Sequence, residues 1–261
     1  MINSLQQPCL DQNGFMSIYK IYSQIMISRE LNKRFGTRVK DLSDPEKCVF
    51  LSWVRILDRN MPEIKITYDI GANDGFTSKL LSIYTNNNVY AFEPLPEFIK
   101  YKRDSHIFIQ PVACGDKNGF LYMNKDKFSP SSSLLKMTGI HIREWPNTGT
   151  GMKVKILVNR LDDWKRKNKL PYPDLLLIDV QGYENNVLSG ADRVLHHTKY
   201  VWIELNFKKF YRHGSTFHSV YTQLTDLGFT LIDCVDLIYS RQNHNLLYMD
   251  GIFKNTRLSS R

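Results

Sequence analysis

The stretch from Ile64 to Gly75, IKITYDIGANDG, constrains the fold of this 261-residue chain more than any other. Its first residues alternate between apolar and polar and then run into Asp69, which is typical of a short strand entering a core. Gly71 and Gly75 follow at once, and FTSKLLSIY continues as the start of an amphipathic helix. A strand, a tight glycine turn and a helix N-terminus form the nucleotide-binding corner of a doubly wound α/β sheet.

The charge around this turn predicts which nucleotide binds there. A dinucleotide site has the spacing G-x-G-x-x-G, so that pyrophosphate lies on free backbone N–H groups. This turn has G-x-x-x-G, with Asp69 and Asp74 on either side. Two carboxylates repel pyrophosphate and attract an ammonium or a sulfonium. S-adenosylmethionine carries both cations and no phosphate, so we predict a methyl-donor site; the alternative is that the glycines serve only the turn.

Two later segments fit the same site. Glu93 ends the next predicted strand, residues 88–92, and follows Asp69 by 24 positions. An acidic residue at this place accepts hydrogen bonds from ribose hydroxyls. Val112 and Ala113 follow the third predicted strand, residues 106–110, where an adenine ring lies in such a sheet. Small residues at a strand end can also serve packing alone.

Composition limits the partners and the compartment. The chain has 35 basic and 26 acidic residues, a net charge of +9, which favours acidic partners or simply solubility. Four separated cysteines with no C-x-x-C pair predict reduced thiols in a cytoplasmic protein. No apolar run approaches the ~20 residues of a membrane span, and the first residues do not form a secretory signal. Basic residues favour an anionic acceptor, and they gather at Arg143, Lys153, Lys155, Arg160, Lys165, Arg166, Lys167 and Lys169.

The chain divides into a helical cap, residues 1–60, and a main domain, residues 61–257. Helical spacing predicts a first helix over residues 15–34, which packs on the main domain or on a second subunit of a homodimer. Ser43 and Glu46 form a capping box that opens a second helix ending before Pro62. From residue 64 onward, strands and helices alternate, which predicts a mainly parallel sheet covered on both faces.

The segment from Lys125 to Gly151 is too long and polar for an ordinary connection. Ser132, Ser133, His141 and Trp145 could contact a polyhydroxylated substrate, with the indole stacking on a sugar face. The alternative is a mobile surface loop.

Seven motifs in this order resemble the FkbM-type S-adenosylmethionine-dependent methyltransferases. They are DIGANDG (69–75), AFEPLPEF (91–98), PVACGDKNG (111–119), SSSL (131–134), VNRLDDW (158–164), LLLIDVQGYENNVLSGA (175–191) and WIELN (202–206). The resemblance implies a Rossmann-like class I methyltransferase with a mainly parallel seven-stranded sheet. It also implies methyl transfer to a hydroxyl of a sugar or a similar product. Leu177 and Gln181 replace the lysine and the glutamate that the family usually has.

Methyl transfer needs an aligned acceptor oxygen and a group that takes its proton. Asp179 ends a predicted central strand, where catalytic groups gather, and Glu204 ends the neighbouring one. We expect Asp179 as base or metal ligand and Glu204 second; with Asn206 they could hold Mg²⁺. The residues expected to contact the cofactor are Asp69, Gly71, Ala72, Asn73, Asp74, Gly75, Glu93, Pro94, Val112, Ala113 and Asp179.

Two other classes stay open at this point. One is a ribose methyltransferase acting on RNA or another nucleic acid, which the net charge of +9 permits. The absence of a lysine beside Asp179 disfavours it. The other is a subunit that keeps the fold and binds the cofactor without catalysis.

Overall fold

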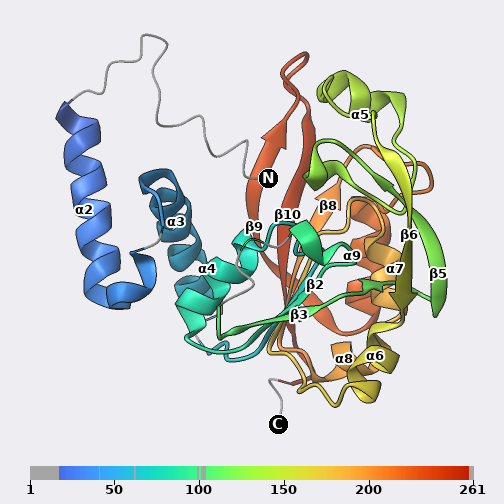
Figure 1. Cartoon of the computed structure of the whole chain (residues 1–261), viewed down its shortest axis with the longest axis horizontal. Coiled ribbons are helices and arrows are strands. Elements are labelled where there is room, and N and C mark those ends of the chain that lie inside the picture. Colours follow the sequence, from blue (N-terminus) through green and yellow to red (C-terminus); the bar gives the residue numbers. More distant parts are fainter. Residues whose placement is uncertain (1–17, 41, 62, 99, 101–103, 259–261) are drawn as a thin grey trace.

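Seven strands form one sheet in the computed structural model, which describes residues 18–258 except 41, 62, 99 and 101–103 (Figure 1). The strands are β1 (Thr67–Ile70), β2 (Val89–Phe92), β3 (Ile107–Gln110), β7 (Leu175–Ile178), β8 (Tyr200–Asn206), β9 (Phe229–Tyr239) and β10 (Leu246–Asn255). Their spatial order is β3-β2-β1-β7-β8-β10-β9, and of these strands β10 alone runs in the direction opposite to the other six. The predicted mainly parallel seven-stranded sheet is confirmed.

Helices cover both faces of this sheet, because successive side chains of a strand point to opposite faces. In β7, Leu175 and Leu177 join one core cluster, which includes residues of α3 (Asp44–Asn60) and α4 (Phe76–Thr85). Leu176 and Ile178 join the opposite cluster. The helices of that second cluster are α6 (Leu161–Lys167), α7 (Glu184–Ser189), α8 (Asp192–His197) and α9 (Phe217–Asp226).

The N-terminal helices share a core with the sheet. α2 (Ile18–Phe35) is followed by η1 (Gly36–Val39); residues 15–17 of the predicted first helix lie outside the described residues. α3 begins at the predicted capping box, where the Glu46 carboxylate accepts the Ser43 N–H at 2.7 Å. Trp53 of α3 stacks on Trp202 of β8, with ring centroids 4.5 Å apart. The boundary at residue 60 between cap and main domain stays a prediction.

A second, three-stranded sheet lies beside the first, in the order β4-β6-β5. Its strands are β4 (Ala113–Cys114), β5 (Gly119–Lys125) and β6 (Met152–Asn159). The long polar segment between β5 and β6 contains η3 (Ser129–Ser131) and α5 (Gly139–Glu144). The Asp126 carboxylate holds this segment together by accepting the N–H groups of Gly149 and Thr150 at 2.8 and 3.1 Å. Thr138 N–H donates to the Phe210 carbonyl, which joins the segment to the chain after β8.

Two elements of the main domain differ from its short parallel strands and helices. Among its described residues, the segment after Glu93 forms a short 3₁₀ turn, η2 (Pro96–Phe98). β9 spans 11 residues, because its second half pairs with the start of β10.

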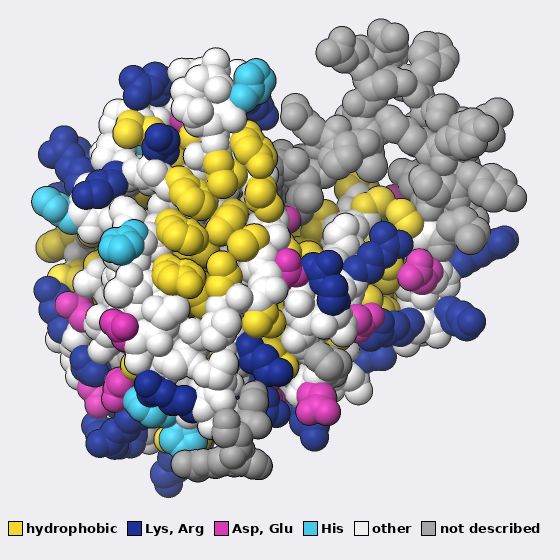
Figure 2. Space-filling model, turned by 180° about the vertical axis from the view of Figure 1, so that it is seen from behind, with side chains coloured by type: hydrophobic (Ala, Val, Ile, Leu, Met, Phe, Trp, Pro, Cys, Tyr) yellow, Lys and Arg dark blue, Asp and Glu magenta, His cyan; other side chains and the backbone are white. Residues whose placement is uncertain are grey.

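Hydrophobic side chains gather on the rear face of the molecule (Figure 2). Several large apolar residues of the C-terminal third are more than a third exposed, namely Phe207, Tyr221, Ile232, Leu237 and Tyr239. None of the helices in the described part of the chain is long and apolar enough to span a membrane.

Candidate functional site

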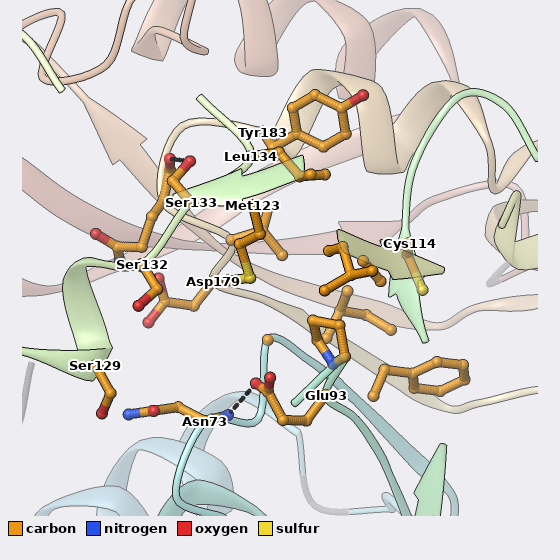
Figure 3. A pocket seen from close by; sticks show the side chains of 18 of the residues that line it. Asn73, Glu93, Cys114, Met123, Ser129, Ser132, Ser133, Leu134, Asp179 and Tyr183 are labelled. Carbon is orange, nitrogen blue, oxygen red and sulfur yellow. Dashed lines mark hydrogen bonds between the residues drawn. The ribbon is translucent and has the colours of Figure 1, made fainter. Parts of the chain in front are cut away.

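Three cavities meet at the carboxyl ends of β1, β2 and β7. The first, the Glu93 cavity (Figure 3), is lined by Ile70, Gly71, Asn73, Phe92, Glu93, Pro94, Phe98, Ala113, Cys114, Met123, Ser129, Pro130, Ser132, Ser133, Leu134, Ile156, Asp179, Val180, Gln181 and Tyr183. The second, the Trp53 cavity, has a volume of about 570 Å³, shares Gly71, Asn73 and Asp179 with the first, and extends beneath α3. The third, the His141 cavity, has a volume of about 60 Å³ and shares Gln181 with the first.

The glycine turn lies between the first two cavities. Gly71 has φ +91°, and a Cβ at this position would lie 2.0 Å from the carbonyl oxygen of Asp179. A close approach between the ends of β1 and β7 therefore requires this glycine. Asn73 follows with φ +48°, and its N–H donates to the Glu93 carboxylate at 2.9 Å. Gly75, with φ +80°, precedes α4 and lies on none of the three cavity walls.

Glu93 is the fixed acceptor of the first cavity. It is 4% exposed, and its two oxygens accept the N–H groups of Asn73 and Leu95 at 2.9 and 2.8 Å. Burial raises the pKa of Glu93 to about 7. The Asn73 Oδ1 is buried without a partner among the described residues, and Asn73 lines both the Glu93 and the Trp53 cavity. A carboxylate and an orphaned amide oxygen suit a ligand that brings hydroxyl or ammonium donors.

The two aspartates that flank the turn are placed differently from the sequence expectation. Asp69 is 1% exposed, accepts the Ser78 hydroxyl at 2.5 Å, and lies on none of the three cavity walls. Burial raises the pKa of Asp69 to about 7. Asp74 lines the Trp53 cavity but pairs with Lys100 at 2.9 Å. The carboxylates on the wall of the Glu93 cavity are therefore those of Glu93 and Asp179, and not those of Asp69 and Asp74 that the sequence suggested.

The other residues expected at the cofactor divide between the cavities. Pro94 and Ala113 line the Glu93 cavity, together with Cys114. Ala72 lines the Trp53 cavity. Val112 is fully buried in the core cluster of α7 and α8 and lies on none of the three walls, so its side chain serves packing.

Asp179 follows β7 and lines the first two cavities, and of the carboxylates on their walls it is the one shared by both. Its Oδ1 accepts the Gln181 amide at 2.6 Å, and Gln181 Oε1 accepts the Tyr211 hydroxyl at 3.1 Å. Burial raises the pKa of Asp179, and the hydrogen bond from Gln181 opposes that shift. A carboxylate with a raised pKa, held at a fixed angle by an amide, can accept a proton from a bound hydroxyl.

Glu204 lies one cavity away. It is 6% exposed, lines the His141 cavity, and its Oε1 accepts the Asn206 amide at 2.7 Å. Burial, and next the charge of Asp179, raises the pKa of Glu204 well above its ordinary value. Glu204 lines neither the Glu93 nor the Trp53 cavity, which makes Asp179 the better placed of the two predicted catalytic residues.

The four residues predicted to contact the substrate do not come together. Ser132 and Ser133 line the Glu93 cavity, where the Ser133 hydroxyl donates to the Gln181 carbonyl at 2.7 Å. His141 and Trp145 line the His141 cavity, whose 60 Å³ is far below the ~300 Å³ of ordinary ligand pockets. Burial lowers the pKa of His141 to about 4, so the imidazole is neutral at pH 7 and is a weak base.

Other residues reach the site without a sequence prediction. Gln181 and Tyr183 flank Gly182, whose φ of +92° marks the turn after β7, so the Q-G-Y pattern after a buried strand was an available signal. Tyr211 arrives from the segment after β8. Five wall residues of the Trp53 cavity come from distant elements, namely Val49, Trp53, Trp202, Asp236 and Asp250.

The proposed metal ligands show no cluster. Within the described residues, no group of three or more His, Cys, Asp or Glu side chains is arranged to hold a metal ion. Asn206 donates its amide to Glu204, which occupies one of the oxygens a cation would need. The donor set does not fit Mg²⁺ in this arrangement, and no step of the chemistry is assigned to it.

Four residues of the predicted basic region lie at the other end of the strands. Arg160, Lys165, Arg166 and Lys169 line a groove with Arg193, and Leu170 and Tyr172 of that groove directly precede β7. Asp179 follows the opposite end of β7. These cations therefore do not line the three cavities.

The sheet order, the glycine turn after β1 and the acidic residue after β2 define a class I methyltransferase. The chain belongs to the methyltransferase FkbM domain family, whose sequence profile matches residues 69–231. It is thus an enzyme of the methyltransferase class, as the motifs predicted.

Three known proteins illustrate the relationship. The 2-O-methyltransferase NoeI of Sinorhizobium fredii is 28% identical over 170 residues, covering 60% of this chain and 69% of the relative. The hexuronic acid methyltransferase AglP of Haloferax volcanii is 25% identical over 170 residues, covering 65% of each. A solved FkbM methyltransferase from Methylobacillus flagellatus aligns with a TM-score of 0.41 and 14% identity, over 89% of this chain and 60% of that one. The chain thus spans about two thirds of the length of these proteins.

Proposed function

We propose that the protein is an S-adenosylmethionine-dependent O-methyltransferase acting on a hydroxyl of a sugar or glycan. The observation that carries this proposal is the position of Asp179 on the shared wall of the Glu93 and Trp53 cavities. One cavity carries the polar groups that suit a nucleoside, and the other has the volume of a ligand pocket. Two relatives whose names describe a 2-O-methyltransferase and a hexuronic acid methyltransferase support a sugar acceptor.

The Glu93 cavity fits the nucleoside of the donor. Glu93 can accept the ribose hydroxyls because each carboxylate oxygen keeps a lone pair after binding its backbone N–H group. The apolar side chains of Phe92, Cys114 and Met123 line the same cavity and suit an adenine face. S-adenosylmethionine, when bound, supplies a methyl group on a sulfonium.

Asp179 performs the proton transfer in this scheme. The acceptor hydroxyl gives its proton to the Asp179 carboxylate while its oxygen takes the methyl group, and the neutral thioether leaves with the bonding pair. Holding the acceptor oxygen at ~3 Å and in line supplies much of the acceleration. Gln181 fixes the carboxylate through its amide hydrogen bond, so that the remaining oxygen faces the acceptor.

A labelled-methyl transfer assay tests the proposal. Full-length protein is incubated with labelled S-adenosylmethionine and separate pools of neutral glycans, uronic acid glycans and RNA, and cofactor binding is measured by calorimetry. We expect cofactor binding and label on a glycan pool. Binding with label on RNA would replace the acceptor class with nucleic acid. Binding without transfer to any pool would favour a non-catalytic subunit, and no heat on titration would remove the cofactor assignment.

A homodimer is part of the same proposal. In the described chain no strand pairs with the outer edge of β9, and this strand carries the exposed side chains of Ile232, Leu237 and Tyr239. An unpaired edge beside exposed apolar side chains (Figure 2) suits pairing with a second copy. Light scattering after size exclusion should give twice the chain mass, and Ile232→Lys with Leu237→Lys should give one chain mass.

A further inference from the structure

Besides Asp179, the Trp53 cavity carries charged side chains that the methyl-transfer scheme does not use. Its charged residues are Asp74, Glu97, Lys100, Asp179, Asp236 and Asp250, so one cation stands among five carboxylates. That cation, Lys100, pairs with Asp74 at 2.9 Å. Neither Asp236 nor Asp250 has a Lys, Arg or His partner among the described residues. The far end of the cavity is therefore uncompensated negative charge.

Asp250 is the group that points to a ligand. It is 3% exposed, and its Oδ2 accepts the Trp202 indole N–H at 2.9 Å. Its Oδ1 is buried without a hydrogen-bond partner, although the residue lines a cavity of about 570 Å³. A buried carboxylate oxygen without a donor is costly. The site is therefore incomplete unless a donor enters the cavity.

Asp236 comes to the same place through an irregular strand. The pairing of β9 with β10 shifts register between Tyr248 and Asp250, and Asp236 has φ +51° at this bulge. A bulge re-aims the side chain of the extra residue. Burial raises the pKa of Asp236 and of Asp250, and the charge of Asp236 raises that of Asp250 further. An added cation would reverse both shifts, because it stabilises the ionised carboxylates.

The other walls select an organic ammonium over a metal ion. Trp53 and Trp202 stack beside the two carboxylates, and Phe76, Leu80 and Leu177 complete an apolar surface. Mg²⁺ and Ca²⁺ need six or more oxygen ligands, and the described residues form no group of three or more His, Cys, Asp or Glu that could hold a metal ion. Indole faces attract an ammonium and also cover the apolar face of a sugar ring.

The sheet order separates this end from the donor. Glu93 follows β2, whereas Asp250 lies on β10, and the order β2-β1-β7-β8-β10 puts three strand spacings between β1 and β10. At ~4.8 Å per spacing this is about 14 Å from the glycine turn. Asp236 and Asp250 line the Trp53 cavity and not the Glu93 cavity. The two carboxylates thus face the acceptor side of Asp179.

We propose that the Trp53 cavity is the acceptor chamber and that it selects an acceptor carrying a protonated amine, such as an amino sugar, which Asp250 and Asp236 bind. This inference rests on the proposed function, since it assumes that a hydroxyl of the same molecule reaches Asp179. The basic residues of the sequence suggested an anionic acceptor, whereas this inference gives the acceptor a positive charge.

The test compares glucosamine with glucose, which differ at one amine. Calorimetry is done at pH 7 on full-length protein saturated with S-adenosylhomocysteine, for the unchanged protein, Asp250→Asn, Asp236→Asn and the control Asp192→Asn. Asp192 is exposed on α8, outside the cavity. Asp250→Asn keeps an oxygen for the Trp202 indole, so the fold is retained. Titration with S-adenosylmethionine measures donor binding in each variant.

We expect the unchanged protein to bind glucosamine about ten-fold or more tighter than glucose, since charge-assisted hydrogen bonds have this strength. Asp250→Asn and Asp236→Asn should each remove most of this difference, while Asp192→Asn keeps it. Donor affinity should stay within about two-fold in all variants. Equal binding of the two sugars by the unchanged protein would overturn the inference. So would a loss of donor affinity in Asp250→Asn, because the carboxylates would then serve the donor's own ammonium. Failure of methyl transfer with the amine preference intact would count against the proposed function alone.

Discussion

Replacing Gly71 by alanine should damage the enzyme far more than its backbone strain alone explains. The Cβ would lie 2.0 Å from the Asp179 carbonyl oxygen and 3.0 Å from its carbonyl carbon. An ordinary contact needs about 3.4 Å or more, so the end of β7 must move by more than about 1 Å. The left-handed φ of +91° adds about 1 kcal/mol.

Gly36 provides a matched control. It also has a positive φ, +58°, but a Cβ there would have no atom within 4 Å. Gly36→Ala should therefore cost only the backbone strain of about 1 kcal/mol. Gly71→Ala should cost about 3 kcal/mol or more, because a well-packed strand end must shift.

The displacement should also reach the chemistry, since the carbonyl that moves belongs to Asp179. A misplacement of about 1 Å can cost about 100-fold in turnover. Denaturant unfolding gives the two free energies of unfolding, and the labelled-methyl assay gives turnover at a temperature where both variants are folded. Equal unfolding free energies and equal turnover for the two variants would refute the argument from close approach.

Three further predictions concern the carboxylates. Asp179→Asn should lower turnover by about 100- to 10,000-fold and leave donor affinity within about two-fold in calorimetry. Turnover of this variant at the wild-type rate would exclude Asp179 as the base. Donor affinity should weaken by up to about ten-fold per pH unit as pH falls below 7, because the ionised Glu93 accepts the ribose hydroxyls and its pKa in the free protein is about 7. Glu93→Gln should flatten this pH profile. A flat profile in the unchanged protein would contradict the role of Glu93. Gln181→Glu should move the acidic limb of the pH–rate profile upward by about one unit or more, since a second carboxylate beside Asp179 raises its pKa; an unshifted limb would show that the amide does not tune the base.

The strand, turn and helix of the proposed donor half were predictable from the sequence because their signals are local. The strand, the glycine turn and the helix start lie within one continuous stretch, and Glu93 follows the next strand at the expected spacing. The source of the negative charge was not predictable in the same way. Asp69 accepts a hydrogen bond from Ser78, and Asp74 forms an ion pair with Lys100. The spacing of residues in the sequence does not reveal either contact.

The acceptor half depended on long-range contacts. The segment between Lys125 and Gly151 has no periodicity, and its shape follows from Asp126 and from the hydrogen bond of Thr138 to Phe210. Asp236 and Asp250 reach the same cavity through the register of two antiparallel strands and a bulge. A pattern of alternating residues predicts such strands but not the position of a bulge between them.

The antiparallel insertion of β10 between β8 and β9 has a consequence for how this enzyme can diversify. It brings β10, which lies near the end of the described chain, into the interior of the sheet, with Asp250 directly opposite Glu204. Substitutions confined to the β9–β10 hairpin would therefore change which acceptor is methylated, while the turn after β1 and Glu93 after β2 would still bind the same methyl donor. Two lineages with the same donor chemistry could diverge in substrate by exchanging one hairpin.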